Sequence, residues 1–146
     1  MSLLRNRYVL IALLVFLLLI GWRAYEDLMP VEEKVDWVFD YDHAFNNSKA
    51  ENKTLLIYFY TSWCSWCKKL SRDTYSNDEV AELLNGNFTC LKINAEEHPD
   101  LVTPYNISGY PTILFLSPEG KELGRILGYK PPDSFIGIAR QYVLKR

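Results

Sequence analysis

Two cysteines, Cys64 and Cys67, have the spacing of a redox-active pair. They lie in the sequence WCSWCK of residues 63–68, directly after the apolar segment LLIYFY of residues 55–60 and at the start of a helical pattern. Two such cysteines in the first turn of a helix can close a small disulfide, and the unpaired backbone N–H groups of that turn favour a thiolate. We therefore predict that Cys64 is the attacking thiolate and that Cys67, one turn inside and less exposed, is the resolving thiol.

The neighbours of the two cysteines are predicted to modify this chemistry. Lys68 and Lys69 add positive charge, which also favours the thiolate. Ser65 and Trp66 separate the cysteines, and we expect the indole to affect both partner fit and redox poise. Ser65 and Lys68 are therefore predicted to tune the pair, and Trp63 and Trp66 to contact the substrate.

A structural zinc site is the alternative interpretation of a C-x-x-C sequence, and it needs two more ligands. The remaining candidates are Cys90, His43 and His98, and the chain has no second C-x-x-C and no H-x₃₋₅-H. We therefore predict no metal site. Cys90 lies in an apolar stretch, where a buried free thiol is favoured over a regulatory third thiol.

The composition limits the classes of function. A chain of 146 residues has room for one domain and an appendage, and three cysteines are too few for a disulfide-stapled scaffold. The net charge is −2 with acids and bases interspersed, so no basic stripe is available for nucleic acid. No organic cofactor is implied, because the electrons of a dithiol reside in the cysteine pair.

The N-terminal region predicts membrane targeting. Residues 8–22 carry no charge and are mostly aliphatic, and no small-x-small cleavage pattern follows them. We favour an uncleaved, single-pass signal anchor over a cleaved signal peptide, with Trp22 at the interface. Arginines at positions 5 and 7 precede the span, and acidic residues outnumber Arg23 after it. The positive-inside tendency therefore keeps the tail, residues 1–7, in the cytoplasm.

The rest of the chain is then predicted to lie outside the inner (cytoplasmic) membrane, in the periplasm or an equivalent space. Residues 23–36 are acidic, contain Pro30 and have no sustained period, which predicts a linker. Residues 37–146 form the predicted catalytic domain. An oxidising compartment of this kind is one in which a dedicated thiol-disulfide exchanger is needed.

Hydrophobic periodicity predicts strands that alternate with helices in this domain. Helices are expected at Trp37–Glu51, at 68–74, at 79–84 and from 131 onward, with a short helix or turn at 99–106. The helix at 79–84 is expected to have its N-cap among residues 76–78 and to end at Gly86. Strands are expected at 55–60, 88–93 and 113–116, the last joined by a turn at 117–120 to a hairpin partner at 123–127. The pattern predicts an α/β fold with a mixed central sheet flanked by helices.

From Trp37 to Arg146 the chain resembles the thioredoxin-fold family. The resemblance rests on WCSWCK after an apolar strand and on Gly109-Tyr110-Pro111-Thr112 before another strand. It is most similar to the periplasmic thioredoxin-like domain of membrane thiol-disulfide interchange reductases and to their single-domain relatives. The resemblance implies a thioredoxin-like fold, a nucleophilic Cys64, a resolving Cys67 and a cis proline at Pro111. Tyr110, the residue before it, would present backbone groups to a bound polypeptide.

Two positions depart from the family pattern. The buried acid that many thioredoxins carry falls here on Tyr58, and the lysine usual on the neighbouring strand is expected to fall on Cys90. The proton acceptor for Cys67 is therefore left unassigned.

The sequence thus predicts a membrane-tethered thiol-disulfide oxidoreductase, acting as a reductase because of the resemblance to reductant-passing domains. Its partners would be protein thiols and disulfides and a membrane electron donor, and we expect a monomer. One alternative is a disulfide oxidase or isomerase. The other is a non-enzymatic chaperone that holds copper or another soft metal with the dithiolate. The small number of methionines and the lack of a well-placed histidine in the sequence argue against this alternative.

Overall fold

The computed structural model describes residues 2–28 and 31–143. Met1 of the predicted tail, Pro30 of the predicted linker and residues 144–146 of the predicted domain lie outside this description. The chain divides into two compact units, residues 1–30 and 31–146.

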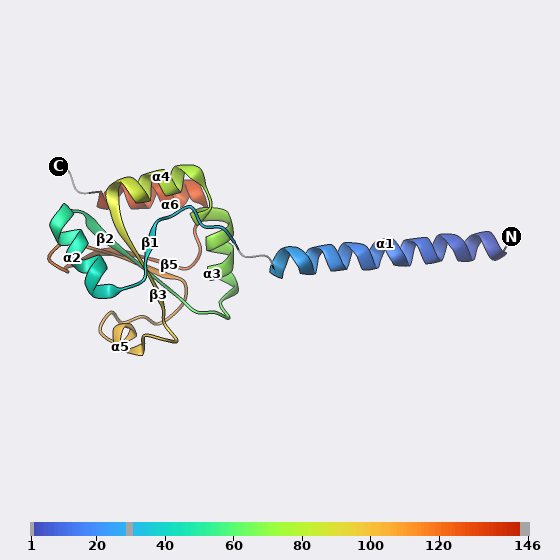
Figure 1. The fold of residues 1–146 in the computed structure, drawn as a ribbon, viewed down its shortest axis with the longest axis horizontal. Coiled ribbons are helices and arrows are strands. Elements are labelled where there is room, and N and C mark those ends of the chain that lie inside the picture. The colour runs from blue at the N-terminus through green and yellow to red at the C-terminus, as the bar shows by residue number, and fades with distance from the viewer. Residues whose placement is uncertain (1, 29–30, 144–146) are drawn as a thin grey trace. The chain divides into compact units, whose positions relative to one another are not determined.

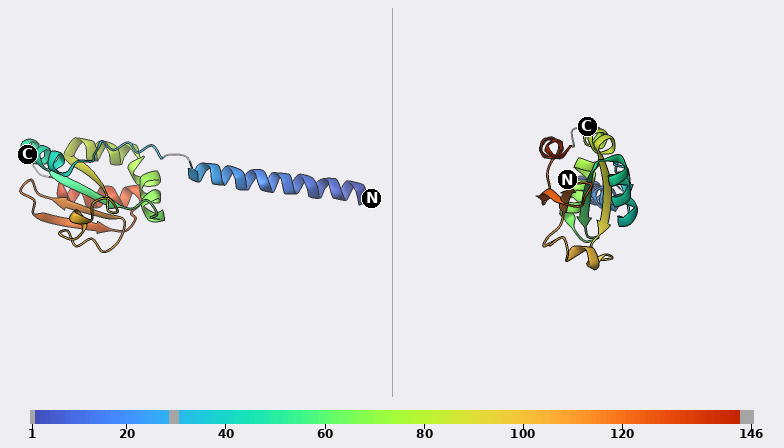
Figure 2. Two further views of the ribbon diagram at one scale, coloured as in Figure 1. Left: turned by 60° about the horizontal axis from the view of Figure 1, so that its bottom comes forward. Right: turned by 90° about the vertical axis from the view of Figure 1, so that its left-hand side faces the viewer.

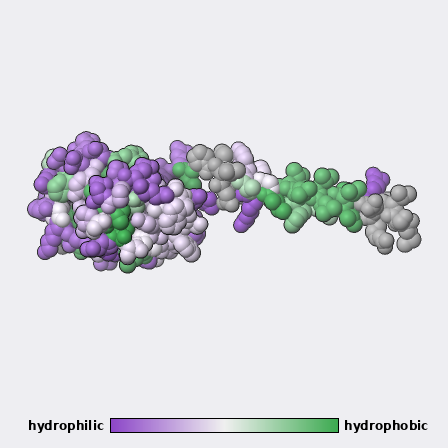
Figure 3. Space-filling view, turned by 90° about the horizontal axis from the view of Figure 1, so that it is seen from below, coloured by the Kyte–Doolittle hydropathy of each residue, from purple (hydrophilic) through white to green (hydrophobic). Residues whose placement is uncertain are grey.

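The first unit is one helix, α1 (Ser2–Leu28), so the first part of the predicted linker continues the helix. Within it, Arg7–Tyr25 is long and apolar enough to cross a bilayer, and none of this stretch is buried. Its apolar side chains form a continuous exposed surface (Figure 3). Length and composition of this kind also fit a signal sequence. Membrane insertion and its orientation therefore stay predictions.

The second unit is built on a mixed, five-stranded sheet of order β1-β3-β2-β4-β5. Its strands are β1 (Trp37–Val38), β2 (Thr54–Tyr60), β3 (Phe88–Asn94), β4 (Thr112–Leu116) and β5 (Glu122–Leu127). Strands β1, β3 and β2 run parallel, whereas β4 is antiparallel to both β2 and β5. The continuous apolar run of β2 is explained by its central place, because six of its seven residues are buried.

Helices cover both faces of the sheet (Figures 1 and 2). One face packs against α2 (Tyr41–Glu51) and α5 (Pro99–Val102). The other face packs against α3 (Ser65–Leu70), its π-helical continuation η1 (Ser71–Tyr75), α4 (Asp78–Asn87) and α6 (Pro132–Ala139). The 3₁₀ turn η2 (Arg140–Tyr142) follows α6. This arrangement confirms the predicted α/β fold with a mixed sheet flanked by helices.

The predicted helix Trp37–Glu51 was wrong at its start. Trp37 and Val38 form the edge strand β1, and the helix begins at Tyr41. The side chain of Asp40 caps it by accepting a hydrogen bond from the His43 N–H at 2.7 Å. The error has a tertiary cause, because pairing with β3 determines the conformation of the two residues before the cap.

The predicted end of α4 at Gly86 was also wrong. The helix continues to Asn87, and the Phe88 N–H bonds the Leu84 carbonyl beyond it. A helical glycine costs about 1 kcal/mol relative to alanine, and burial of Val80 and Leu84 on the same helix outweighs that cost. The predicted N-cap is confirmed at Asn77, whose side chain accepts two backbone N–H bonds.

Residues 31–36, the last part of the predicted linker, pack against the domain. Val35 is buried, and the Lys34 N–H donates to the Tyr75 carbonyl at 2.9 Å. The side-chain amide of Asn85 bridges the segment, accepting from the Asp36 N–H and donating to the Lys34 carbonyl. This stretch therefore belongs structurally to the second unit.

Candidate active site

The two cysteines form a disulfide at the N-terminus of α3. Cys64 is the N-cap residue, the Cα atoms of Cys64 and Cys67 are 5.2 Å apart, and the Cys67 N–H donates to the Cys64 Sγ at 3.1 Å. The Cys64 carbonyl accepts the first bond of the helix, from the Lys68 N–H. Upon reduction, the same N–H group and the helix N-terminus would stabilise a thiolate on Cys64.

The exposure of the pair has the predicted order, although the difference is small. Cys67 is the less exposed residue at 2%, but Cys64 is also covered, with 5% of its surface exposed. Both flanking indoles are exposed, Trp63 at 67% and Trp66 at 59%. A partner would therefore meet an aromatic surface around a largely covered disulfide.

The loop before the dithiol is held by a glutamate, Glu96. Both the N–H and the hydroxyl of Ser62 donate to the Glu96 Oε2 at 2.7 Å. These bonds hold the pKa of the Glu96 carboxyl below its usual range. The Cys64 N–H also donates to the Thr61 carbonyl, which closes the turn into α3.

The predicted tuning residues lie on the first turns of α3. Ser65 and Lys68 are exposed. Lys69 forms an ion pair with Asp73, whose hydrogen bond raises the pKa of the Lys69 ammonium, and Lys69 in turn lowers the pKa of the Asp73 carboxyl. The charge of Lys69 is thus partly compensated, while the effect of Lys68 on the dithiol stays a prediction.

The proline loop lies beside the dithiol helix. The Tyr110–Pro111 peptide bond is cis, which confirms that prediction. The Tyr110 ring contacts Trp63 edge-on, with centroids 6.2 Å apart, and packs against the core cluster that contains both active-site cysteines. The structure therefore brings Trp63, Trp66 and Tyr110 together beside the dithiol, with Pro111 directly after Tyr110. The role of these four residues in substrate binding stays a prediction.

Behind Cys67 lies Tyr58, at the position where the family pattern expects an acid. Its side chain is buried, and its hydroxyl donates to the Cys67 carbonyl at 3.4 Å. Burial raises the pKa of the Tyr58 hydroxyl, so it stays protonated at neutral pH and is no proton acceptor there.

The expectation that Cys90 occupies the family's lysine position was wrong. In the parallel register of β2 and β3, Cys90 lies opposite Leu56, and Lys92 lies opposite Tyr58. The Lys92 Nζ is 5.7 Å from the centroid of the Tyr58 ring. The error is a shift of two residues along β3, which keeps a side chain on the same face of the sheet.

The acid that pairs with Lys92 comes from an unexpected place. Glu33, in the segment predicted as a linker, accepts from the Lys92 Nζ at 2.7 Å and from the Trp37 indole N–H. The Glu33 and Lys92 side chains are 9% and 17% exposed. No local signal in the sequence links Glu33 to this site, because the pairing spans 59 positions of the chain.

Cys90 itself is the buried free thiol that was predicted. Burial raises the pKa of the Cys90 thiol, so it stays protonated at neutral pH. Such a thiol is a poor nucleophile and fits a packing role in β3.

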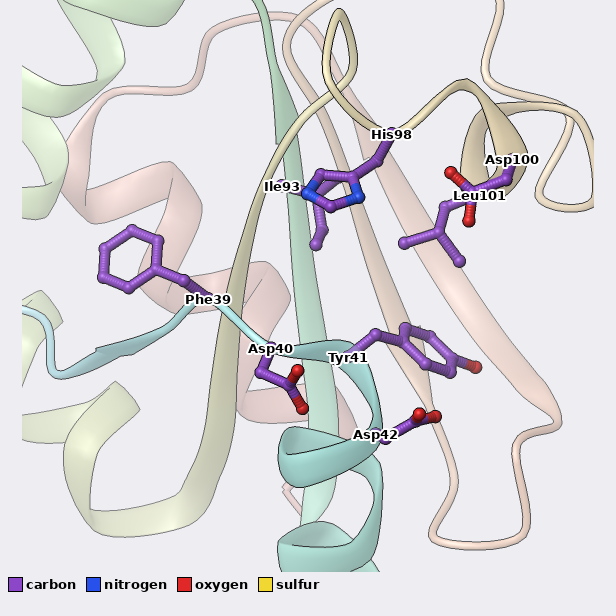
Figure 4. Close-up of a pocket in the computed structure, with 8 residues that line it drawn as sticks. All are labelled: Phe39, Asp40, Tyr41, Asp42, Ile93, His98, Asp100 and Leu101. Carbon is purple, nitrogen blue, oxygen red and sulfur yellow. The ribbon is translucent and has the colours of Figure 1, made fainter.

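A pocket away from the dithiol lies between the start of α2, the end of β3 and α5 (Figure 4). Its lining contains neither active-site cysteine and consists of Phe39, Asp40, Tyr41, Asp42, Ile93, His98, Asp100 and Leu101. Asp40 is already engaged as the cap of α2. Within residues 2–28 and 31–143, no three His, Cys, Asp or Glu side chains gather in a way that could hold a metal ion.

Comparison with known proteins places this site in a family. The family model Thioredox_DsbH, described as a protein of unknown function, DUF255, matches residues 27–141. Thioredoxin of Chlamydia caviae is 35% identical over 97 residues, which cover 66% of this chain and 89% of that protein. Thiol:disulfide interchange protein DsbD of Yersinia pestis is 30% identical over 94 residues, 61% of this chain and 16% of DsbD.

Like DsbD, other relatives are much longer than this chain, which spans only a small part of their length. Spermatogenesis-associated protein 20 of mouse is 29% identical over 120 residues, which cover 77% of this chain and 15% of that protein.

Solved structures show the same fold. A DsbH oxidoreductase superimposes with a TM-score of 0.69 at 20% identity, over 82% of this chain and 94% of that one. The C-terminal domain of DsbD from Neisseria meningitidis in its oxidised form has a TM-score of 0.60 at 25% identity, over 69% and 90%. A C-x-x-C disulfide at a helix N-terminus in this fold supports thiol-disulfide oxidoreductase chemistry, and the chain belongs to the thioredoxin-like Thioredox_DsbH (DUF255) family.

Proposed function

We propose that the protein is a membrane-tethered thiol-disulfide oxidoreductase that acts as a reductase of cysteine-containing proteins. The observation that carries this proposal is the Cys67 N–H directed at the Cys64 Sγ, 3.1 Å away at the start of α3. That hydrogen bond would stabilise the Cys64 thiolate, which is the form that attacks a disulfide.

The reaction proceeds in two exchange steps. In the reduced protein, the Cys64 thiolate attacks one sulfur of a substrate disulfide, so a mixed disulfide forms and the other substrate sulfur leaves as a thiolate that takes up a proton. Cys67, after losing its proton, attacks the Cys64 Sγ and releases the second substrate thiol. The substrate gains two electrons and two protons, and the protein is left with the Cys64–Cys67 disulfide. The cycle needs no organic cofactor.

The reductase direction is supported by the similarity to thiol:disulfide interchange protein DsbD. The oxidised protein would be reduced again by a dithiol donor in the membrane. Helix α1 supports the tether, because its apolar stretch is long enough to span a bilayer and is exposed along its length. We place its N-terminus in the cytoplasm and the catalytic unit, as a monomer, in the periplasm or an equivalent compartment.

Trapping of the intermediate tests this function. We expect the reduced Cys67→Ser chain in mild detergent to accumulate a mixed disulfide with a disulfide-bonded protein such as insulin, because no thiol remains to resolve it. Mass spectrometry of the proteolysed adduct should place the bond on Cys64. A Cys64→Ser chain treated in the same way should give no adduct. Failure of Cys67→Ser to form the adduct, or an adduct on Cys90, would refute the proposed exchange.

A further inference from the structure

The segment before β1, residues 31–36, places a covered charge in the domain. The Glu33 carboxylate is paired with the Lys92 Nζ at 2.7 Å and also accepts from the Trp37 indole N–H. The Glu33 and Lys92 side chains are 9% and 17% exposed, so water screens this pair only weakly. The exchange steps proposed above give the pair no role.

A layer of aromatic rings connects this pair to the resolving cysteine. The Lys92 Nζ lies 5.7 Å from the centroid of the Tyr58 ring, and the Tyr58 hydroxyl donates to the Cys67 carbonyl at 3.4 Å. The Trp37 ring lies 5.7 Å from the Tyr58 ring and 4.9 Å from the Tyr75 ring. Both tyrosines belong to the core cluster that contains Cys67, and Trp37 packs against that cluster. The ion pair therefore lies behind Cys67, with Tyr58 in contact with both.

The other titratable groups in this part of the core are uncharged at neutral pH. They are Tyr58, Tyr60, Tyr75 and Cys90. Burial raises the pKa of each of these side chains, so all four keep their protons.

Glu33 is the charged group that acts on all three of these tyrosines. Its carboxylate raises the pKa of Tyr58, Tyr60 and Tyr75. The remaining charges act on single members of the group: Asp36 and Lys53 on Cys90, and Glu96 and Glu97 on Tyr60. The field at the back of Cys67 therefore depends on Glu33 and on its partner Lys92.

The resolving step is sensitive to such a field. Cys67 is 2% exposed, and burial disfavours its thiolate, which is the form that attacks a mixed disulfide at Cys64. A positive charge nearby favours this thiolate, and a negative charge disfavours it. With the ion pair intact the two effects largely cancel, so loss of either partner should change the rate of resolution.

We propose that Glu33 is a positioning residue for the resolving step and that, through its pair with Lys92, it sets how readily Cys67 loses its proton to solvent. In this step the Cys67 thiolate attacks the Cys64 Sγ of the mixed disulfide. The Cys64–Cys67 bond forms, the bond to the substrate breaks, and the substrate sulfur leaves as a thiolate. The inference rests on the proposed function, since it concerns one step of the same exchange.

The test separates the two cysteines in time. The reduced full-length chain in detergent is mixed by stopped flow with an excess of the chromogenic disulfide dithiobis(nitrobenzoate). One coloured thionitrobenzoate is released when Cys64 attacks the reagent, and a second is released when Cys67 resolves the adduct. The first phase depends on the reagent concentration, whereas the second phase is intramolecular and does not.

The two partners should change the second phase in opposite directions. Glu33→Gln leaves the Lys92 ammonium without its ion-pair partner, which stabilises the Cys67 thiolate, and should speed the second phase about threefold. Lys92→Met leaves the Glu33 carboxylate without its partner and should slow that phase about threefold. The first phase should change less, because the Cys67 N–H stabilises the Cys64 thiolate locally.

Two further variants separate charge from general damage. The double change Glu33→Gln, Lys92→Met removes both charges and should return the second phase close to the wild-type rate. Lys34→Gln, at an exposed neighbour in the same segment, should leave both phases unchanged.

The outcomes are distinct. If the two single variants do not change the second phase in opposite directions, the role of Glu33 is overturned while the proposed function stands. An equal change in both phases means that the pair acts on the whole site and not on Cys67, which also overturns it. Absence of the first phase in the wild-type chain refutes the proposed function and this inference together.

Discussion

Replacement of Cys64 by serine is expected to lower the rate of disulfide reduction by more than about 10³-fold. Cys64 and Cys67 act as one catalytic unit, and removal of one member of such a unit abolishes most of the rate enhancement that the unit provides. A serine hydroxyl stays protonated at neutral pH, so the N–H of Cys67 would have no thiolate to stabilise. The measurement is the initial rate of hydroxyethyl disulfide reduction by the pre-reduced chain.

Cys90→Ala is the matched control for this prediction. Cys90 is free and buried, and its raised pKa keeps the thiol protonated at neutral pH, so its loss should leave the rate unchanged. Substantial activity in Cys64→Ser, or a comparable loss in Cys90→Ala, would contradict the assignment of Cys64 as the nucleophile.

Replacement of Glu33 by alanine is expected to reduce the free energy of unfolding by about 3 kcal/mol, because the ion pair is partly buried and removal of one partner from a fully buried pair costs about 3–5 kcal/mol. The Glu33 carboxylate is the 2.7 Å partner of Lys92, and both side chains are largely covered. Without it, the ammonium would lose its ion-pair partner and be left among the rings of Trp37, Tyr58 and Tyr60. Urea unfolding followed by tryptophan fluorescence measures the loss.

An exposed ion pair from the same segment provides the control. The side chains of Lys34 and Asp78 are 48% and 89% exposed, so Lys34→Ala should cost at most about 1 kcal/mol. The double change Glu33→Ala, Lys92→Met should be more stable than Glu33→Ala alone, because it removes the unpaired charge. Equal costs for Glu33→Ala and Lys34→Ala would show that the buried pair does not fasten residues 31–36 to the domain.

The parts of the site that the sequence predicts are those with a local signal. The apolar strand β2, the C-x-x-C spacing and the Tyr110-Pro111 motif each lie within a few residues of the chain. The strand pattern and helix start fix where Cys64 and Cys67 lie, and the structure confirms that geometry.

The parts that the sequence does not predict depend on contacts between distant segments. Glu33 meets Lys92 across 59 positions, and Tyr129 meets Asp73 across 56. A glutamate in an aperiodic acidic stretch has the same local pattern whether it is solvated or buried, so only the packed fold distinguishes the two. The strand β1 was missed for the same reason, since its conformation comes from its pairing with β3.

The equilibrium reduction potential of the Cys64–Cys67 pair tests the central claim most directly. It would be measured on the full-length chain in detergent against glutathione or dithiothreitol, with Cys67→Ser as the control that has no internal couple. A reductase fed from the membrane predicts a value near that of thioredoxin, about −270 mV. A value near about −120 mV would identify an oxidant and contradict the proposed direction. Absence of a reversible two-electron couple would refute redox function, and copper retention after dialysis would then indicate a metal chaperone.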